Sequence, residues 1–313
     1  PHTLQTRGVY RTRTWYRDLA RNPNLERIDV PDLTDEEIFA GFDEHYQSSY
    51  DNALVRISAI DSWRLTKTLP FMCGEFRWTG FDYIGECYGW PAKSWNFGVV
   101  DLCGFPKDTY YFYKSQWTTE PMVHILPHWT WPGLEGKAIP VIAYSNCDQV
   151  ELFLDDESLG KQVWDDDAMQ LRWDVNYRPG TLKAVGYRND ETVAVCTHVT
   201  AGKPAAIRLT CNEMVVRADG TGIAHVAAEV VDSNGQVVPH ANHDINFVVD
   251  GPAQLIGLEN GDPIDRTNYK ADHRRAFHGM MLAILKSTGK PGMITVQADA
   301  EGLHKGQCEV RAG

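Results

Sequence analysis

The sequence predicts an α/β segment, a C-terminal piece of a (β/α)8 barrel, followed by two immunoglobulin-like β-sandwiches. Helical patterns alternate with short apolar runs up to about residue 118, and beyond residue 120 short alternating runs separated by turn residues replace them. The linker-like stretch Ala201-Gly202-Lys203-Pro204 divides these runs into two sets. With 313 residues, the chain has room for two or three domains of roughly 100–150 residues. We expect the parts to be 1–118, 119–202 and 203–313.

The first part shows the order helix, strand, loop, helix. Asp35–His45 has acidic residues in its first turn, and Leu54–Lys67 places apolar residues three apart, so both are predicted to be helices. Phe71–Trp78 is expected to be a buried strand and Lys107–Trp117 another helix. This order is typical of a β/α barrel, which needs eight strands. Only one complete barrel strand is found, so we expect either a fragment or a partner polypeptide that supplies the rest.

The second and third parts are predicted to be all-β, with strands joined by turns such as Asp155-Asp156, Asn189-Asp190 and the hairpin turn Asp232–Gly235. In the second part, the predicted strands are Pro140–Tyr144, Val150–Leu154, Gln170–Val175, Thr181–Tyr187 and Thr192–Val199. In the third, they are Ala206–Thr210, Met214–Arg217, Ala224–Val231, Ile245–Val249, Met281–Leu285, Met293–Ala298 and Gln307–Val310.

Composition excludes several classes of protein. The net charge of −12 argues against nucleic acid as a partner, because a phosphate backbone attracts Lys and Arg. No apolar run approaches the ~20 residues of a membrane helix. The seven cysteines are scattered and form no C-x-x-C pair, which predicts no metal site and favours reduced thiols in a cytoplasmic protein. A secreted protein with one or two disulfides is the alternative. We expect no cofactor.

Aromatic residues are concentrated between Trp78 and Trp131. Such density is typical of a heavy hydrophobic core, because each ring buries a large area. Sugar-binding sites are also built from aromatic faces, which cover the apolar C–H patches of pyranose rings. Density alone leaves both interpretations open.

Gly74–Trp117 contains G-E-F-x-W-T-G-F-D-Y-x-G-E, then F-G-x-V-D-x-C-G-F-P-K-D, then Q-W. This composite string resembles the last barrel strand, following loop and final helix of family 2 glycoside hydrolases. It is most similar to the bacterial β-galactosidase-like branch with two extra C-terminal β-sandwich domains. The similarity continues through Val141–Gly160 and Gly257–Pro263 and covers essentially the whole chain. It implies a retaining exo-glycosidase that releases terminal β-galactosyl residues from a β-linked oligosaccharide or glycoside.

The same resemblance places the catalytic carboxylates outside this chain. Arg7-Gly8-Val9-Tyr10 resembles the R-G-x-Y that follows the seventh barrel strand, where the nucleophilic glutamate lies eight residues before the Arg. That position is upstream of Pro1, and the acid/base glutamate would lie further upstream. Retaining enzymes need both carboxyl groups, about 5–5.5 Å apart. We therefore expect no catalytic residue here and an N-terminal catalytic portion, on the same chain or a separate one, as a partner.

Substrate-binding residues are implied around the loop that follows Phe71–Trp78. Trp78 would stack on the sugar ring, whereas the alternative is a core tryptophan. His2 would lie near the primary hydroxyl of the sugar. Asp82 would accept hydrogen bonds from vicinal hydroxyls, or else cap a loop or pair with an arginine. The remaining candidates would contact the aglycone or sugar hydroxyls, or else pack the loop: Tyr88, Trp90, Lys93 and Asn96.

Two other acids are expected to be structural. Glu86 is predicted to stabilise the loop. Glu75 is predicted to be a buried carboxylate paired with an arginine such as Arg77 or Arg7, because it lies inside the predicted strand.

One missing motif bears on the substrate. Family 2 β-glucuronidases carry an N-x-K motif that binds the uronate carboxylate, and here Trp95 and Phe97 stand at the Asn and Lys positions. A buried carboxylate without its cation is costly, so a neutral hexoside is preferred. A β-glucuronidase or β-galacturonidase stays open because Lys93 could supply the cation. A non-catalytic carbohydrate-binding protein is the alternative from another class.

The two β-domains show no recognisable chemistry. Trp164 and Trp173 are expected in the core between the sheets, although a carbohydrate-binding face is the alternative. Gly261-Asp262-Pro263 is predicted to be a loop turn, and Asp272–Arg275 solvated charge. We expect these domains to serve packing or the contacts of a homo-oligomer.

Overall fold

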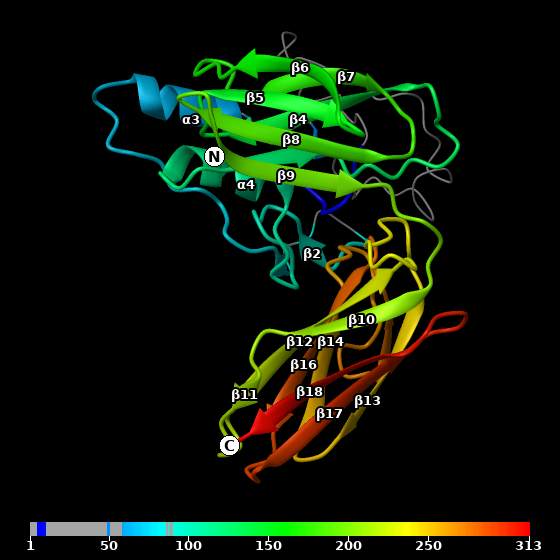
Figure 1. Ribbon diagram of the computed structural model, residues 1–313. Coiled ribbons are helices and arrows are strands. Elements are labelled where there is room, and N and C mark those ends of the chain that lie inside the picture. Colours follow the sequence, from blue (N-terminus) through cyan, green and yellow to red (C-terminus); the bar gives the residue numbers. More distant parts are fainter. Residues whose placement is uncertain (1–4, 11–48, 51–57, 86, 88–89) are drawn as a thin grey trace. The chain divides into compact units, whose positions relative to one another are not determined.

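The computed structural model describes residues 5–10, 49–50, 58–85, 87 and 90–313. The chain divides into two compact units, Pro1–Thr200 and Ala201–Gly313, and strands predominate in both (Figure 1). The predicted helix Asp35–His45 lies outside the described residues, as does the start of Leu54–Lys67.

Two helices of the first unit lie where the sequence predicts them. Helix α3 (Ala59–Thr68) begins at Ser58, whose hydroxyl accepts a hydrogen bond from the Asp61 N–H at 2.9 Å, and it ends before Pro70. Helix α4 (Asp108–Trp117) begins after Pro106. The Trp63 indole of α3 donates to Gln116 of α4 at 3.1 Å, which joins the two helices.

The predicted buried strand Phe71–Trp78 is not formed in this chain. No described strand pairs with this segment, and Phe71 and Phe76 are 77% and 99% exposed. Its apolar residues predicted burial, but a strand also needs a hydrogen-bonding neighbour, and none is described beside it. The only strands between α3 and α4 in the described region are the short β1 (Tyr83–Ile84) and β2 (Ser94–Trp95), which pair antiparallel.

The rest of the first unit is a β-sandwich. One sheet has the order β3-β4-β7 and the other β6-β5-β8-β9. The strands are β3 (Val123–Leu126), β4 (Ala138–Ser145), β5 (Gln149–Leu154), β6 (Glu157–Val163), β7 (Leu171–Asn176), β8 (Thr181–Arg188) and β9 (Glu191–Val199). All five strands predicted here are present, whereas β3 and β6 were not predicted.

The core of this unit explains why β4 lacks alternation. Seven consecutive residues of β4 are buried. One face of its sheet faces the other sheet, and Phe112 of α4 lies against Tyr144 of β4 with ring centroids 5.6 Å apart. A strand covered on both faces reads as a continuous apolar run. Trp173 is buried and Trp164 packs on the core, as predicted.

The second unit is another two-sheet β-sandwich, with orders β10-β12-β16-β14 and β11-β18-β17-β13-β15. The strands are β10 (Ala206–Cys211), β11 (Val215–Val216), β12 (Ile223–Val231), β13 (Asp244–Asp250), β14 (Ala253–Glu259), β15 (His273–Arg275), β16 (Met280–Ser287), β17 (Gly292–Asp299) and β18 (Gly306–Ala312). Every strand predicted here is present. Strands β14 and β15 were not predicted.

The turns follow the sequence signals. Asp155-Asp156 and Asn189-Asp190 have positive φ angles of 49° to 65° and close the β5–β6 and β8–β9 hairpins. Asp and Asn tolerate this conformation better than most residues, and it matches the twist of the flanking strands. None of the described helices has the length and apolar character needed to cross a lipid bilayer.

Candidate functional site

The candidate site is built on two extended segments that lie side by side, residues 78–82 and 96–100. The Thr79 N–H donates to the Phe97 carbonyl at 3.3 Å, and the Asp82 N–H donates to the Val100 carbonyl at 3.0 Å. Gly98 permits this approach, because a Cβ at this position would lie 2.2 Å from the Asp82 nitrogen. The two segments therefore form a fixed support for the loop between them.

A buried ion pair lies beneath this support. Lys107 Nζ is fully buried and donates to Asp82 Oδ1 at 2.6 Å and to the Gln5 carbonyl at 2.7 Å. Asp82 Oδ1 also accepts from the Gly98 N–H at 2.8 Å. Burial raises the pKa of Asp82 to about 7, against the opposing effect of the Lys107 ammonium, and burial lowers the pKa of Lys107. Removing either partner would leave the other buried without its ion partner.

A second buried pair fixes the turn before α4. Arg7 Nε donates to Asp101 Oδ2 at 2.5 Å, and the side chains are 8% and 1% exposed. Asp101 Oδ1 accepts from the N–H groups of Cys103 and Phe105 at 2.8 and 2.9 Å. One carboxylate thus joins the N-terminal segment to this turn.

Large apolar side chains are exposed between residues 71 and 90. Trp78 is 54% exposed, and its indole N–H donates to the Tyr83 hydroxyl at 3.3 Å. The two rings meet edge to face, with centroids 6.0 Å apart. The exposed apolar residues of this stretch are Phe71, Met72, Phe76, Trp78, Phe81, Ile84 and Trp90. Exposed apolar residues that occur together in this number often mark a surface that contacts a partner or ligand.

The residues predicted to bind substrate fall into three groups. Trp78 and Trp90 are exposed, and Lys93 is half-buried. Asp82 and Asn96 are buried and bound to protein groups, since Asn96 Nδ2 donates to Thr6 Oγ1 at 2.9 Å and Asp82 pairs with Lys107. His2 and Tyr88 lie outside the described residues.

Glu75 was expected to pair with an arginine such as Arg77 or Arg7. Its charge acts on Arg77, where it opposes the lowering of the Arg77 pKa by burial, but it does not pair with Arg7. Glu75 Oε2 accepts from the hydroxyls of Ser62 and Thr66 on α3, at 2.6 and 3.0 Å. Arg7 is paired with Asp101 instead. The reason is the position of residues 71–78, which lie outside any described sheet, so Glu75 meets the helix that precedes it in sequence.

The described acids near the two segments each bind protein partners: Glu75, Asp82 and Asp101. Within the described ranges, no group of three or more His, Cys, Asp or Glu side chains is placed to hold a metal ion. The described residues can bind and orient a ligand.

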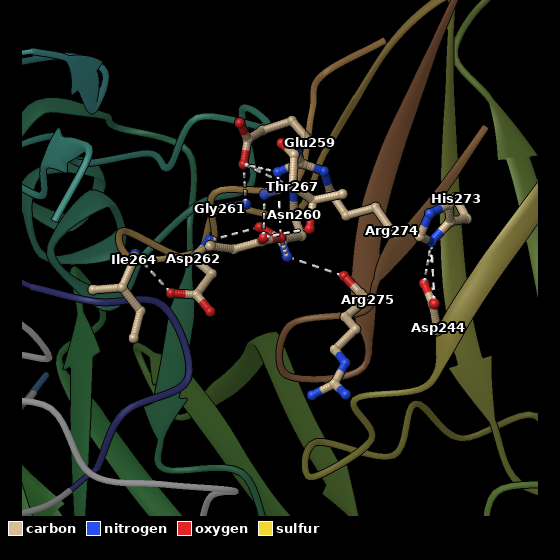
Figure 2. A network of polar contacts seen from close by, with 11 residues as sticks. Asp244, Glu259, Asn260, Gly261, Asp262, Ile264, Thr267, His273, Arg274 and Arg275 are labelled. Atoms are coloured by element: carbon tan, nitrogen blue, oxygen red, sulfur yellow. Dashed lines mark hydrogen bonds and ion pairs between the residues drawn. The ribbon is translucent and has the colours of Figure 1, made fainter. Parts of the chain in front are cut away.

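The second unit holds a further polar network, which corrects one prediction (Figure 2). Arg274 was expected to be solvated, but its side chain is fully buried, and its Nη1 lies 3.5 Å from Glu259 Oε1 and 3.3 Å from Asp265 Oδ2. Arg274 lies in the middle of β15. Because successive side chains of a strand point to opposite faces, Arg274 points inward while His273 and Arg275 point to the outer face. Asn260 Nδ2 donates to Asp265 Oδ2 at 2.7 Å, so the network also holds the loop after β14.

Lys107 was not among the residues predicted from the sequence to have a role at this site. Its signal was present in the G-F-P-K-D part of the motif, where a lysine directly precedes a helix. Its partner, Asp82, is 25 residues away, so local periodicity gives no indication of the pair.

Comparison with known proteins places these features in a family. The model described as glycoside hydrolase family 2 C-terminal domain 5 matches residues 207–309, and a domain of unknown function (DUF4982) matches residues 136–194. A putative β-glucuronidase of Formosa agariphila is 40% identical over 93% of this chain. A β-galactosidase of Bacteroides ovatus is 40% identical over 85% of it. The crystal structure of a β-glycosidase from Bacteroides vulgatus matches the whole chain, with a TM-score of 0.89 and 41% identity.

The chain belongs to glycoside hydrolase family 2. It spans about a third of the curated relatives that it matches, 30% of the Formosa protein and 32% of the Bacteroides ovatus protein. It covers 41% of the Bacteroides vulgatus structure. The predicted family is therefore confirmed, and the exposed apolar residues around Trp78 belong to a family 2 chain.

Proposed function

We propose that the protein containing this chain is a retaining exo-glycoside hydrolase that releases terminal β-galactosyl residues. In this proposal the chain supplies the last barrel strand, a substrate-binding loop and two accessory immunoglobulin-like sandwiches. The observation that carries the proposal is the half-exposed Trp78 indole, held on a fixed support within a family 2 chain. The two catalytic glutamates would come from the N-terminal catalytic portion.

The position of Trp78 suits a sugar platform. The Trp78 indole is 54% exposed in this chain, so it has an apolar face that a ligand can cover. Its N–H is already bound to the Tyr83 hydroxyl, which limits rotation of the ring. If roughly 80 Å² of apolar surface leaves water when a pyranose stacks there, the gain is about 2 kcal/mol.

The other exposed residues of this stretch support the interpretation that it is part of a barrel and that another segment covers it. Phe71 and Phe76 would cost free energy in water if nothing covered them. In the proposal, residues 71–78 become a barrel strand when they pair with strands of the N-terminal portion. The same pairing would bury Phe76 and leave Trp78 at the strand end, where barrel active sites lie.

The preference for a neutral sugar rests on Trp95 and Phe97. Their rings stack on each other, with centroids 4.7 Å apart and planes 27° apart. Apolar side chains therefore stand at the two positions where the β-glucuronidase motif has Asn and Lys. A uronate carboxylate needs a cation there. The second candidate is a β-glucuronidase, favoured by the name of the Formosa relative and by the nearby Lys93.

Hydrolysis of p-nitrophenyl β-galactoside and p-nitrophenyl β-glucuronide by the intact protein tests the proposal. We expect the galactoside to be cleaved with the higher kcat/KM and the 313-residue chain alone to show no turnover. A higher kcat/KM for the glucuronide would select the second candidate. Turnover by the isolated chain would overturn the placement of the catalytic glutamates.

A further inference from the structure

The ammonium group of Lys107 has acceptors on three separate segments of the first unit. It donates to Asp82 Oδ1 at 2.6 Å and to two backbone carbonyls, that of Gln5 at 2.7 Å and that of Asn96 at 3.3 Å. An ammonium group has three N–H donors, so each donor has one acceptor here. The side chain is fully buried, so water has no access to these contacts. Lys107 therefore joins segments that are far apart in the sequence.

The lysine itself is fixed in place by the start of a helix. Its backbone N–H donates to the Val99 carbonyl at 2.9 Å, and it is the residue directly before α4. In the first turn of α4, the Thr109 N–H donates to the side-chain carbonyl of Gln5 at 3.1 Å. The ammonium group thus lies at a fixed point from which it can hold the three segments together.

Asp82 connects this point to the exposed rings. It is the residue directly before Tyr83, whose hydroxyl accepts a hydrogen bond from the Trp78 indole at 3.3 Å. The two rings also meet edge to face, with centroids 6.0 Å apart. The backbone between them, residues 79–82, is hydrogen-bonded at both ends to residues 97–100. A displacement of Asp82 would therefore move Tyr83 and, with it, the partner of the Trp78 indole.

We propose that Lys107 is a positioning residue for the surface on which the sugar stacks. Its ammonium group fixes Asp82, and the backbone from Asp82 to Tyr83 transmits this position to the Trp78 indole. The role rests on the proposed function, because that function takes Trp78 to be the stacking surface.

Removal of the ammonium group would displace the rings through the buried carboxyl group. Asp82 would keep the Gly98 N–H as a donor at 2.8 Å, which leaves a buried carboxyl group short of hydrogen bonds. For this group to reach water instead, residues 79–83 must shift. The shift takes the Tyr83 hydroxyl away from the Trp78 indole, so the indole loses its fixed orientation.

Fluorine NMR of the intact protein, labelled with fluorotryptophan, reports the surroundings of Trp78 without any substrate. Trp78→Phe and Trp117→Phe assign the two resonances by their disappearance. In Lys107→Met, we expect the Trp78 resonance to move by more than its linewidth, because the indole moves relative to the Tyr83 ring, and the Trp117 resonance to stay in place. An unchanged Trp78 resonance in Lys107→Met would overturn the proposal.

Two further variants separate position from stability. Leu152→Ala removes a fully buried side chain from β5, whose neighbours are β6 and β8, so it destabilises the same unit in a strand that contributes nothing to the site. It should leave the Trp78 resonance unchanged, and a shift like that of Lys107→Met would overturn the proposal.

The second variant combines Asp82→Asn with Lys107→Met. It buries no unpaired charge and so regains stability, but it lacks the ammonium donors and should still show the displaced Trp78 resonance. This variant decides the question if Lys107→Met alone does not fold. A Trp78 resonance that returns to its position in the unaltered protein would give Lys107 a stabilising role only and overturn the proposal.

Kinetics of the intact protein with p-nitrophenyl β-galactoside test the connection to the sugar. Lys107→Met should raise KM about tenfold and leave kcat within about threefold, because a stacking surface binds the ground state and the transition state alike. In Trp78→Ala, which already lacks the indole, the addition of Lys107→Met should change KM by less than about twofold. A further tenfold rise in KM in that background would show that Lys107 acts elsewhere and overturn the proposal.

The two measurements fail in different ways. If the galactoside is not cleaved but the Trp78 resonance moves in Lys107→Met, the proposed function fails and the positioning of the indole by Lys107 stands. If the galactoside is cleaved and the Trp78 resonance does not move, the positioning role fails and the proposed function stands.

Discussion

Replacing Lys107 with methionine tests whether the buried pair beneath the candidate site holds it in place. Lys107 and Asp82 have side-chain exposures of 0% and 5% and lie 2.6 Å apart. Methionine retains most of the side-chain length but removes the ammonium group. Asp82 then stays buried with the Gly98 N–H as a remaining donor.

The expected loss is large because Asp82, which stays buried, loses its ammonium partner and must either keep an unpaired charge or take up a proton. Breaking a buried ion pair by removing one partner costs about 3–5 kcal/mol. The carbonyls of Gln5 and Asn96, which accept from Lys107 at 2.7 and 3.3 Å, also lose a donor. Asp82→Asn combined with Lys107→Met removes both charges, so we expect the double variant to recover about 2 kcal/mol relative to the sum of the single changes.

Urea unfolding of the chain, followed by tryptophan fluorescence, measures these free energies. Lys67→Met is the matched control, since Lys67 pairs with Asp166 at 3.1 Å on the surface, with exposures of 43% and 78%. It should cost less than about 1 kcal/mol. Equal effects of Lys107→Met and Lys67→Met would refute the reasoning, as would strictly additive behaviour of Asp82→Asn and Lys107→Met.

Two further predictions concern other buried charges. Arg274→Met should destabilise the second unit by about 3–5 kcal/mol, whereas Arg275→Met, on the exposed neighbour, should change its unfolding free energy by less than about 0.5 kcal/mol; similar urea midpoints would contradict this. Although burial opposes it, the hydrogen bond between His124 Nε2 and Asp108 Oδ1 raises the folded-state pKa of His124 from 6.5 to about 9. The stabilisation by His124 is therefore fully present below pH 6.5 and is lost as pH rises through about 9. The cost of His124→Gln should therefore fall by ~3 kcal/mol between about pH 6 and pH 10, and a cost that does not change with pH would contradict the assignment.

The sequence predicted the β-sandwiches well because their signals are local. In β12, alternate residues point into the core, and Asn189-Asp190 provides the turn that a tight hairpin requires. In the first unit it failed for β3 and β6. Strand β3 is short and mostly buried, and β6 is largely exposed, so neither shows the expected alternation.

The candidate site was predicted less completely because it depends on contacts between distant residues. Trp78, which was predicted to stack on a sugar ring, is 54% exposed, in a segment that was predicted to be a buried strand. Burial of Asp82 by Lys107 and of Asn96 by Thr6 joins positions 25 and 90 residues apart, which periodicity does not reveal. Arg274 was misjudged for the same reason, since its neighbours in sequence are charged while its partners, Glu259 and Asp265, lie on another strand and a loop.

The kinetics of Trp78→Ala in the intact protein test the central claim most directly, with Trp117→Ala as the control because its exposure, 56%, matches the 54% of Trp78. If Trp78 stacks on the sugar, losing about 2 kcal/mol should lower kcat/KM for p-nitrophenyl β-galactoside roughly 30-fold. Trp117→Ala should leave kcat/KM within about twofold of the unaltered protein. Equal kcat/KM values for the two variants would contradict the assignment of Trp78 as the sugar platform.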